Sequence, residues 1–336
     1  MRKQPRPCEA TSQEAHLTRR DLLSYALSIG GASALTALWP RSPALAAGTA
    51  AQAVSRYLVY IGGAGAVIDS LIDMQQVAAP PTQAPPTDPT KRMRVPMLRQ
   101  APPASATMTQ IHIAMGWNPP KPFADWVAAA VHVATPQNGS LFVTDANMNV
   151  REAYNWFGGT ISRIDLPACD AASTLTTSPV LTIQAPQLTQ VSASGPPPGH
   201  LSPQSRIWRQ QNFGLTSTAP ITESLKRTLR VGAIALGPTI LGGTVDIAMG
   251  FGPERPDLLG PFQTALQHGG QLMAQPTDVT VHLLTPDMRL EMATVILHAC
   301  RILALNVMPP QAGTRALPTT TVTLAFADAS LAVTPA

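Results

Sequence analysis

The segment Ile111-His112-Ile113-Ala114-Met115-Gly116-Trp117 returns, with small changes, as Val245-Asp246-Ile247-Ala248-Met249-Gly250-Phe251. Each copy is followed by a proline-bounded helical pattern and then by three short segments in the same order. The offset between matched residues is 134 at Ala114/Ala248, 140 at Met148/Met288 and 141 at Thr182/Thr323. Self-similarity at a nearly fixed spacing is the signature of a repeated structural unit. The sequence therefore predicts a tandem duplication of one domain.

Each copy predicts a strand, a turn, a helix and three further strands. The expected helices span 122–134, with an apolar stripe that includes Phe123 and Trp126, and 256–268, with a stripe that includes Phe262. The expected strands after them lie at 141–144, 147–150 and 180–183, and at 279–282, 287–290 and 321–324. Alternating apolar residues bury one sheet face and leave the other wet, as in antiparallel sheets. We expect a mainly β protein with two tandem antiparallel β-barrel or sandwich domains and one short helix per repeat.

Two proline-rich stretches divide the chain. Residues 78–106 contain Ala-Pro-Pro three times, and proline cannot donate to a sheet ladder, so this stretch is predicted to be an insertion without strands. Residues 192–206 fall between the two repeats, where a linker is expected. The predicted domains are therefore 53–191 and 207–336.

Residues 1–46 have the pattern of a twin-arginine export signal. Arg19 and Arg20 precede two leucines and a weakly apolar run, and Ala44-Leu45-Ala46 offers a small-residue cleavage site. An uncleaved membrane anchor and a chance arginine pair before a buried helix remain alternatives. The prediction is an exported protein, periplasmic or extracellular, which touches the membrane only through this signal.

The basic character of the chain comes from this leader. It holds six of the 23 basic and three of the 19 acidic residues, which leaves 17 basic and 16 acidic residues, a net charge of +1. A nucleic-acid partner is not expected, because such binding needs a concentrated positive surface.

The run from Tyr57 to Ile68 carries a glycine-rich turn, Gly62-Gly63-Ala64-Gly65. A dinucleotide-binding turn needs Gly or Ala where Ile68 stands, and an acidic residue after a second strand, which this chain lacks. A β-hairpin that turns at the glycines is the better interpretation, and no cofactor is predicted.

No catalytic residue and no metal ligand is predicted. Metal sites need three or four ligands at recognisable spacing, and the histidines show none, although His282 and His298 on consecutive strands could face each other. No Gly-x-Ser-x-Gly or His-Glu-x-x-His motif occurs. The acidic residues stand mostly at strand ends and helix starts, where carboxylates cap and solvate. Cys169 and Cys300 could form one bridge, but buried free thiols are expected.

The tryptophans of the predicted domains are expected in the core. Trp117 matches Phe251 and Trp156 matches Ile296, and apolar replacement at matched positions favours packing over a sugar-stacking surface.

The C-terminal copy resembles the tail-tube proteins of contractile phages and the related tube proteins of bacterial injection systems. The resemblance rests on a strand at Asp278–Leu284, a second at Leu290–Arg301 and a last long strand at Thr319–Leu331. Residues 57–77 look like the opening strand and hairpin of that family, whereas Ala299-Cys300-Arg301 stands where the family has Ala-Trp-Pro.

The resemblance implies small barrels that pair sheet edges around a sixfold ring, which two-domain chains would build as a trimer. On this basis the chain is expected to be a structural protein that self-associates into a ring or tube, or binds a protein partner. A periplasmic hydrolase or carbohydrate-binding protein on a β-sandwich is the alternative, and a surface adhesion domain is a third.

Overall fold

A computed structural model describes residues 56–78, 107–198, 206–218, 221–240, 242–250, 260–269, 277–308 and 319–335. The prediction of a mainly β protein with antiparallel sheets is confirmed. The first sheet is built from β1 (Arg56–Ile61), β2 (Ala64–Ile68), β3 (Ser70–Ala78), β4 (Thr107–Ala114), β5 (Gln137–Thr144), β6 (Val150–Leu166), β8 (Val180–Ala185), β9 (Gln187–Gly195) and β12 (Ile234–Leu236). The second is built from β7 (Cys169–Asp170), β10 (Phe213–Ser217), β11 (Thr228–Val231), β13 (Gly243–Gly250), β14 (Thr277–Leu284), β15 (Glu291–Met308), β16 (Thr319–Phe326) and β17 (Asp328–Val333). The helices are α2 (Lys121–Ala129), α3 (Thr222–Leu225) and α4 (Gly260–Gln267).

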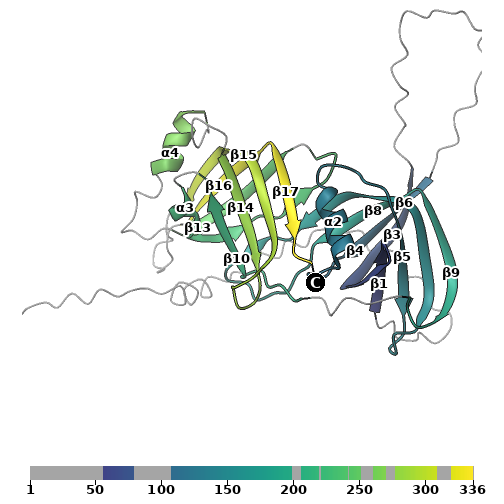
Figure 1. The fold of residues 1–336 in the computed structure, drawn as a ribbon. Helices are drawn as coiled ribbons and strands as arrows, with labels where there is room; N and C mark the ends of the chain where they lie inside the picture. The colour runs from purple at the N-terminus through teal and green to yellow at the C-terminus, as the bar shows by residue number, and fades with distance from the viewer. Residues whose placement is uncertain are drawn as a thin grey trace, which may run out of the picture.

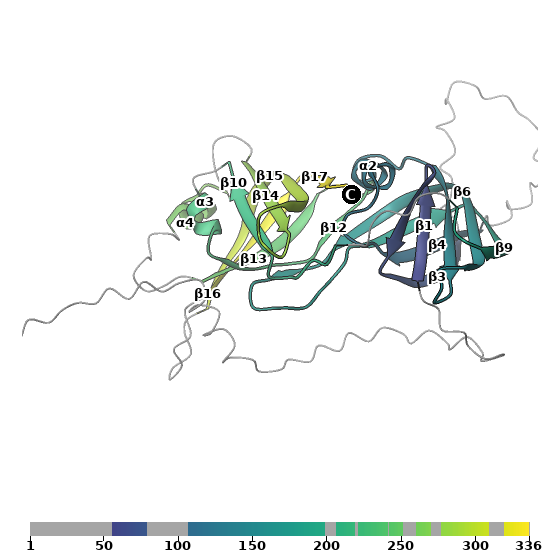
Figure 2. The same cartoon turned by 60° about the horizontal axis from the view of Figure 1, so that its bottom comes forward.

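The two sheets have the same order of paired strands. The first runs β1-β5-β6-β8-β4-β3, with β9 on β6, and the second runs β10-β14-β15-β16-β13-β11, with β17 on β15. The two copies of the repeated segment lie on β4 and β13, and each of these strands pairs with the corresponding late strand, β8 or β16. The sheets lie beside each other, with α2 in the middle, α4 at one end and β9 at the other (Figure 1). A turned view keeps this order (Figure 2).

The longest strands, β6 and β15, each bend and change partners. The part of β6 up to Gly159 pairs with β5 and β9, and the part from Thr160 pairs with β8 and β12. In β15, the part up to Cys300 pairs with β14 and β17, and the part from Arg301 pairs with β16. Gly158 and Ala299 both have positive φ, 61° and 53°. A left-handed residue in a strand bends it, so one side of each long strand can close over the core.

Two expected strands are turns instead. Residues 147–150 and 287–290 were predicted to be extended, but β6 begins at Val150 and β15 begins at Glu291. Met148 and Met288 have φ of 63° and 60° and donate their N–H groups to the carbonyls of Asp145 and Thr285. The apolar methionine suggested a strand, whereas the neighbouring polar side chains bond to the local backbone and form a turn.

Other boundaries also differ from the sequence predictions. The last strand, expected as Thr319–Leu331, is divided at Ala327 into β16 and β17. The helix expected at 122–134 ends at Ala129, and the described part of the helix expected at 256–268 begins at Gly260. The stretch expected to be a linker overlaps β9, which continues to Gly195. The hairpin turning at Gly62 and Gly63 is confirmed, because β1 pairs with β2 from Ile61↔Ala64 onward.

The core is apolar and contains three fully buried tryptophans, Trp117, Trp156 and Trp208. Trp156 lies between Gly139 and Gly159, where added Cβ atoms would come within 2.3 and 2.5 Å of its ring. The predicted core position of Trp156 is confirmed, but its match to Ile296 is wrong. Gly139 pairs with Trp156 and Val279 pairs with Leu297, so Leu297 takes the corresponding place.

Candidate functional site

The two sheets exchange strands where they meet. Strand β12, which follows β11 of the second sheet, pairs with β6 of the first, with Ile234 opposite Leu166 and Leu236 opposite Ile164. These four side chains are all less than 5% exposed. Strand β7, which follows β6, pairs in turn with β11 of the second sheet. The junction is therefore made by backbone ladders in both directions, with an apolar layer beneath them.

The backbone directly after β12 approaches β6 closely at Gly237. A Cβ atom at this position would lie 2.6 Å from the carbonyl oxygen of Ser162 on β6. The junction also carries an ion pair at its surface, where Arg230 Nη2 lies 2.8 Å from Asp170 Oδ2. The arginine side chain is 63% exposed, so the pair contributes about 1 kcal/mol or less. Close packing of backbone and apolar side chains is the main source of stability at the junction.

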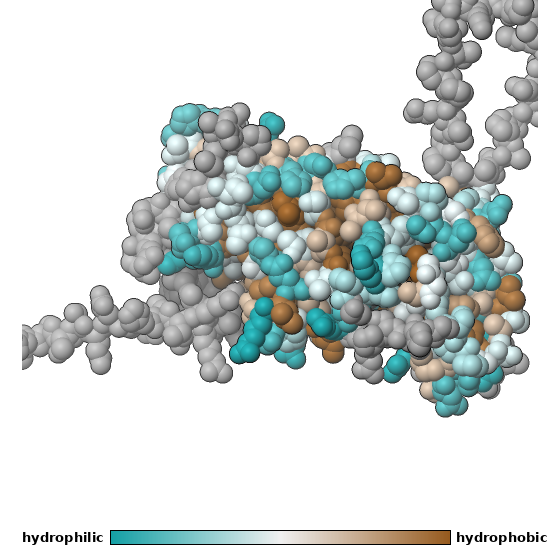
Figure 3. Space-filling view, in the orientation of Figure 1, coloured by the Kyte–Doolittle hydropathy of each residue, from teal (hydrophilic) through white to brown (hydrophobic). Residues whose placement is uncertain are grey.

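Helix α2 covers part of the second sheet. It contacts β17, on which Ala329, Leu331 and Val333 are buried. The corresponding strand of the first sheet, β9, pairs with β6 in the same way that β17 pairs with β15. There Gln190 and Ser192 stand in the places of Leu331 and Val333, and both are exposed. In Figure 3 apolar side chains gather over the middle of the molecule, around β17 and α2.

A free sheet edge lies at the end of β15. From Arg301 to Met308 the described part of the chain gives β15 one strand partner, β16. The side chains of Leu303, Val307 and Met308 are 53%, 47% and 56% exposed there. In the first sheet, β3 is the last strand of the strand order and therefore an edge strand, and its Ile72 side chain is exposed. Unpaired N–H and C=O groups with apolar neighbours are a ready template for another strand.

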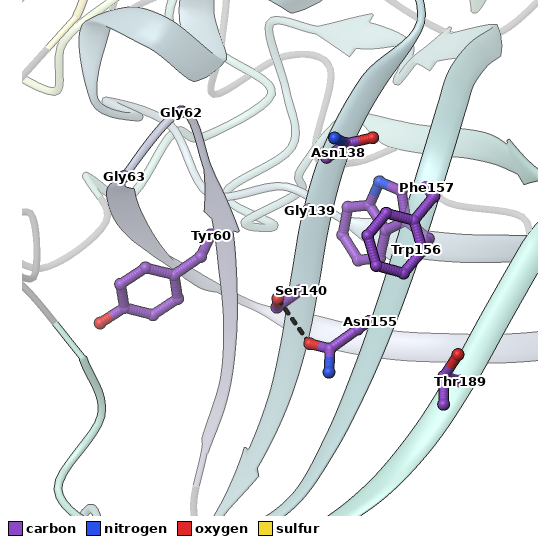
Figure 4. A pocket seen from close by; sticks show the side chains of 10 residues that line it. All are labelled: Tyr60, Gly62, Gly63, Asn138, Gly139, Ser140, Asn155, Trp156, Phe157 and Thr189. Carbon is purple, nitrogen blue, oxygen red and sulfur yellow. Dashed lines mark hydrogen bonds between the residues drawn. The ribbon is translucent and has the colours of Figure 1, made fainter.

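A shallow hollow of about 400 Å³ opens on the first sheet between β1, β5, β6 and β9 (Figure 4). Asn138, Asn155 and Thr189 supply polar groups, and Ser140 donates a hydrogen bond to Asn155 Oδ1 at 2.7 Å. Phe157 is 53% exposed beside it. Tyr60 points away from these polar groups, and burial raises the pKa of its phenol. The buried Nε1 of Trp156 has no hydrogen-bond partner among the residues that the structure describes.

His282 and His298 contact different partners. His282 Nδ1 lies 2.8 Å from Glu291 Oε1, whereas His298 Nδ1 lies 3.1 Å from Asp278 Oδ2 and its Nε2 lies 2.9 Å from Ser330 Oγ. The expectation that the two could face each other is wrong, because the register of β14 on β15 places Thr294 opposite His282. Within the described residues no group of three or more His, Cys, Asp or Glu side chains is arranged to hold a metal ion.

Three other ionisable groups, Asp145, Cys169 and Cys300, lie in a turn or in the core. Asp145 accepts hydrogen bonds from the backbone N–H groups of Asn149 and Asn147 and from Arg151, which lower its pKa. Cys169 and Cys300 are buried free thiols, as predicted, and burial raises the pKa of each to about 12. A thiol with so high a pKa is not a nucleophile near neutral pH.

The residues predicted for targeting and cleavage, Arg19, Arg20, Ala44 and Ala46, lie outside the described residues. Among the helices that the structure describes, none is long and apolar enough to cross a bilayer. The junction itself was not predicted from sequence, since no local signal shows that β12 leaves its own sheet.

No protein-family model matches the chain, and no curated protein matches it. Among solved structures it is similar to a protein of the sheath–tube complex of the extracellular contractile injection system PVC in its extended state, with 11% identity, 37% of this chain and 89% of that chain covered, and a TM-score of 0.28. It is also similar to the tube-terminating cap of the anti-feeding prophage (8% identity, 31% and 66% covered, TM-score 0.25) and to its baseplate (13% identity, 51% and 93% covered, TM-score 0.23). These similarities are too low, in identity and in TM-score, to assign a function.

Proposed function

We propose that the chain is an exported structural protein that self-associates, or binds a protein partner, through the edges of its sheets. The observation that carries this proposal is the reciprocal strand exchange at the junction. There β12 pairs with β6 and β7 pairs with β11, so sheet edges of these units already act as binding surfaces. The apolar free edge at the end of β15 is a further surface of the same kind.

We infer that the two units are copies of one domain. The shared strand order supports this, as do the left-handed residues at matched positions, Met148 with Met288 and Gly158 with Ala299. A chain with two similar units is suited to ring formation, since a head-to-tail contact repeated by rotation closes a ring and otherwise builds a tube or filament. A trimer with six units around the ring is the smallest assembly that this proposal favours.

The oligomeric state tests the proposal. We expect the purified full-length chain to have a mass in light scattering that is a multiple of 35.4 kDa and rises with concentration, and to form rings or short tubes in negative-stain micrographs. A single mass of one chain at all concentrations would remove self-association from the proposal.

Export by the twin-arginine route is tested separately. Replacement of Arg19 and Arg20 by lysine is expected to keep the protein in the cytoplasm, because paired arginines are required by that pathway. The first residue of the exported protein shows whether cleavage follows Ala46. Retention of Met1 in an exported, membrane-bound protein would favour an anchor instead.

The hollow on the first sheet favours a second function, the binding of a carbohydrate. Asparagine and threonine side chains beside an exposed aromatic ring are a combination suited to hydroxyl groups and sugar faces. Titration with short glycans, followed by intrinsic tryptophan fluorescence, should then show a change that is lost in Asn155→Ala. If no glycan changes the fluorescence, the carbohydrate-binding function is contradicted and only the assembly role remains proposed.

A further inference from the structure

The free edge of β15 has a counterpart inside the same chain that is already occupied. Paired residues relate β6 to β15 by an offset of 141, since Ile161 pairs with Ile183 as Ile302 pairs with Leu324. Ile164 and Leu166 therefore correspond to Leu305 and Val307. In β6 these positions pair with β12, whereas in β15 the only described strand that pairs with them is β16. Among the described helices, α4 contacts β15.

Burial at these positions shows what is missing. Ile164 and Leu166, which pair with β12, are 0% and 4% exposed. Val307, the counterpart of Leu166, is 47% exposed, and the neighbouring Met308 is 56% exposed. Leu305, the counterpart of Ile164, is half-buried against the core, whereas the apolar side chains of Val307 and Met308 are open to water. Exposed apolar residues beside an unpaired edge indicate a binding surface more than a solvated end.

We propose that this edge, Leu305–Met308, pairs with β3 of a second copy of the chain, as β12 pairs with β6 within one copy. This inference rests on the proposed self-association and names its contact. Strand β3 is chosen because it pairs with β4 as β11 pairs with β13, and because it precedes β4 in the chain as β11 and β12 precede β13. It forms the end of the first sheet's strand order and exposes Ile72.

The helix contact of the junction is not repeated in this assembly. Its acceptor would be β9, where Gln190 and Ser192 replace the buried Leu331 and Val333 of β17. Its donor would be α4, where Gln263 is exposed at the place of the buried Ala124 of α2. Polar groups on both sides do not favour close packing, because they lose water without gaining partners. The contact between copies is therefore mainly a strand ladder, and it is weaker than the junction within one chain.

The test uses the full-length chain and the double variant Val307→Lys with Met308→Lys. Both side chains are exposed in one copy, so the fold is preserved, whereas two charges at the edge oppose addition of a strand. Sedimentation velocity over a range of concentrations is expected to show at least a tenfold rise in the dissociation constant. Ile72→Lys, on the other side of the contact, is expected to have a similar effect. Circular dichroism checks that the β content is unchanged.

The matched control is Val133→Lys with Leu175→Lys, which adds the same charge at apolar residues that are 61% and 67% exposed elsewhere. Association equal to that of the unmodified chain is expected for this control. If the unmodified chain associates and the β15 variant associates equally well, the edge assignment is overturned while self-association stands. If only the β15 variant is impaired and Ile72→Lys is not, β3 is not the occupant. A monomeric unmodified chain would overturn both proposals.

Discussion

The side chain of Asp278 holds the bend of β15, because its Oδ1 accepts a hydrogen bond from the backbone N–H of Ala299 at 3.2 Å. The first unit has the same arrangement, with Asn138 Oδ1 accepting from the N–H of Gly158 at 2.9 Å. In both units a side chain at the start of one strand satisfies the N–H group that the bend leaves outside the ladder. A buried or half-buried N–H without such a partner destabilises a sheet.

The bend leads to a prediction about glycine. Ala299 has a φ of 53°, which disfavours any residue with a Cβ atom, whereas Gly158 at the matched bend is unstrained. Ala299→Gly is expected to raise the free energy of unfolding by up to about 1 kcal/mol, since relief of strain exceeds the added flexibility of the unfolded chain. Gly158→Ala is expected to lower it by about 1 kcal/mol. Chemical denaturation measures both, and a loss of stability in Ala299→Gly would contradict the argument.

The packing around Trp156 predicts coupling between this residue and Gly139. A Cβ atom at Gly139 would lie 2.3 Å from the Trp156 ring, so Gly139→Val alone is expected to destabilise the protein by about 1–3 kcal/mol. The second unit has Val279 and Leu297 at these places. Trp156→Leu combined with Gly139→Val should therefore recover part of the loss, because the smaller side chain makes room for the larger one.

A double-mutant cycle in denaturant measures this coupling. Additive effects of the two substitutions would show that the glycine is not kept for the tryptophan. Gly214→Ala serves as a control glycine, since a Cβ atom there meets Leu284 only at 3.9 Å.

The carboxylate of Asp145 predicts how stability changes with acid. Its pKa is lowered in the folded protein, first by the hydrogen bond from the N–H of Asn149 and also by Arg151. A lowered folded pKa means that this group stabilises the fold above its unfolded pKa of about 4, and that the contribution is lost as the pH falls through the folded value. Asp145→Asn should keep the turn hydrogen bonds but lose this dependence. The measured free energy of unfolding should then change less between neutral pH and acid than in the unmodified chain.

The amino-acid sequence was sufficient for the mainly β fold class with antiparallel sheets but not for the register of β15. Trp156 was matched to Ile296 because the offset at Met148/Met288 was carried forward unchanged. The turn of the second unit is one residue longer: the N–H of Asp145 bonds to the carbonyl of Asn149, whereas that of Thr285 bonds to Leu290. One inserted residue in a turn moves every following side chain by one position.

The junction was beyond sequence-based reasoning for a different reason. Strand β12 is three residues long, and the pairing of Ile234 with Leu166 joins residues 68 positions apart. From its apolar residues alone, β12 could equally well continue β11 beside β13 in the second sheet. Which sheet it joins depends on the position of β6, and this follows only from the complete fold.

Gly237 provides the most direct test of that junction. A methyl group at this residue would lie 2.6 Å from the carbonyl oxygen of Ser162, a main-chain atom that cannot rotate away. Gly237→Ala should separate the sheets locally and destabilise the protein by about 1–3 kcal/mol. Hydrogen exchange should be faster at β12 and at residues 164–166 of β6, while exchange at β10 and β14 stays unchanged. Uniformly faster exchange across both sheets would mean that the junction and the two sheets unfold as one unit, so that the substitution does not weaken the junction separately.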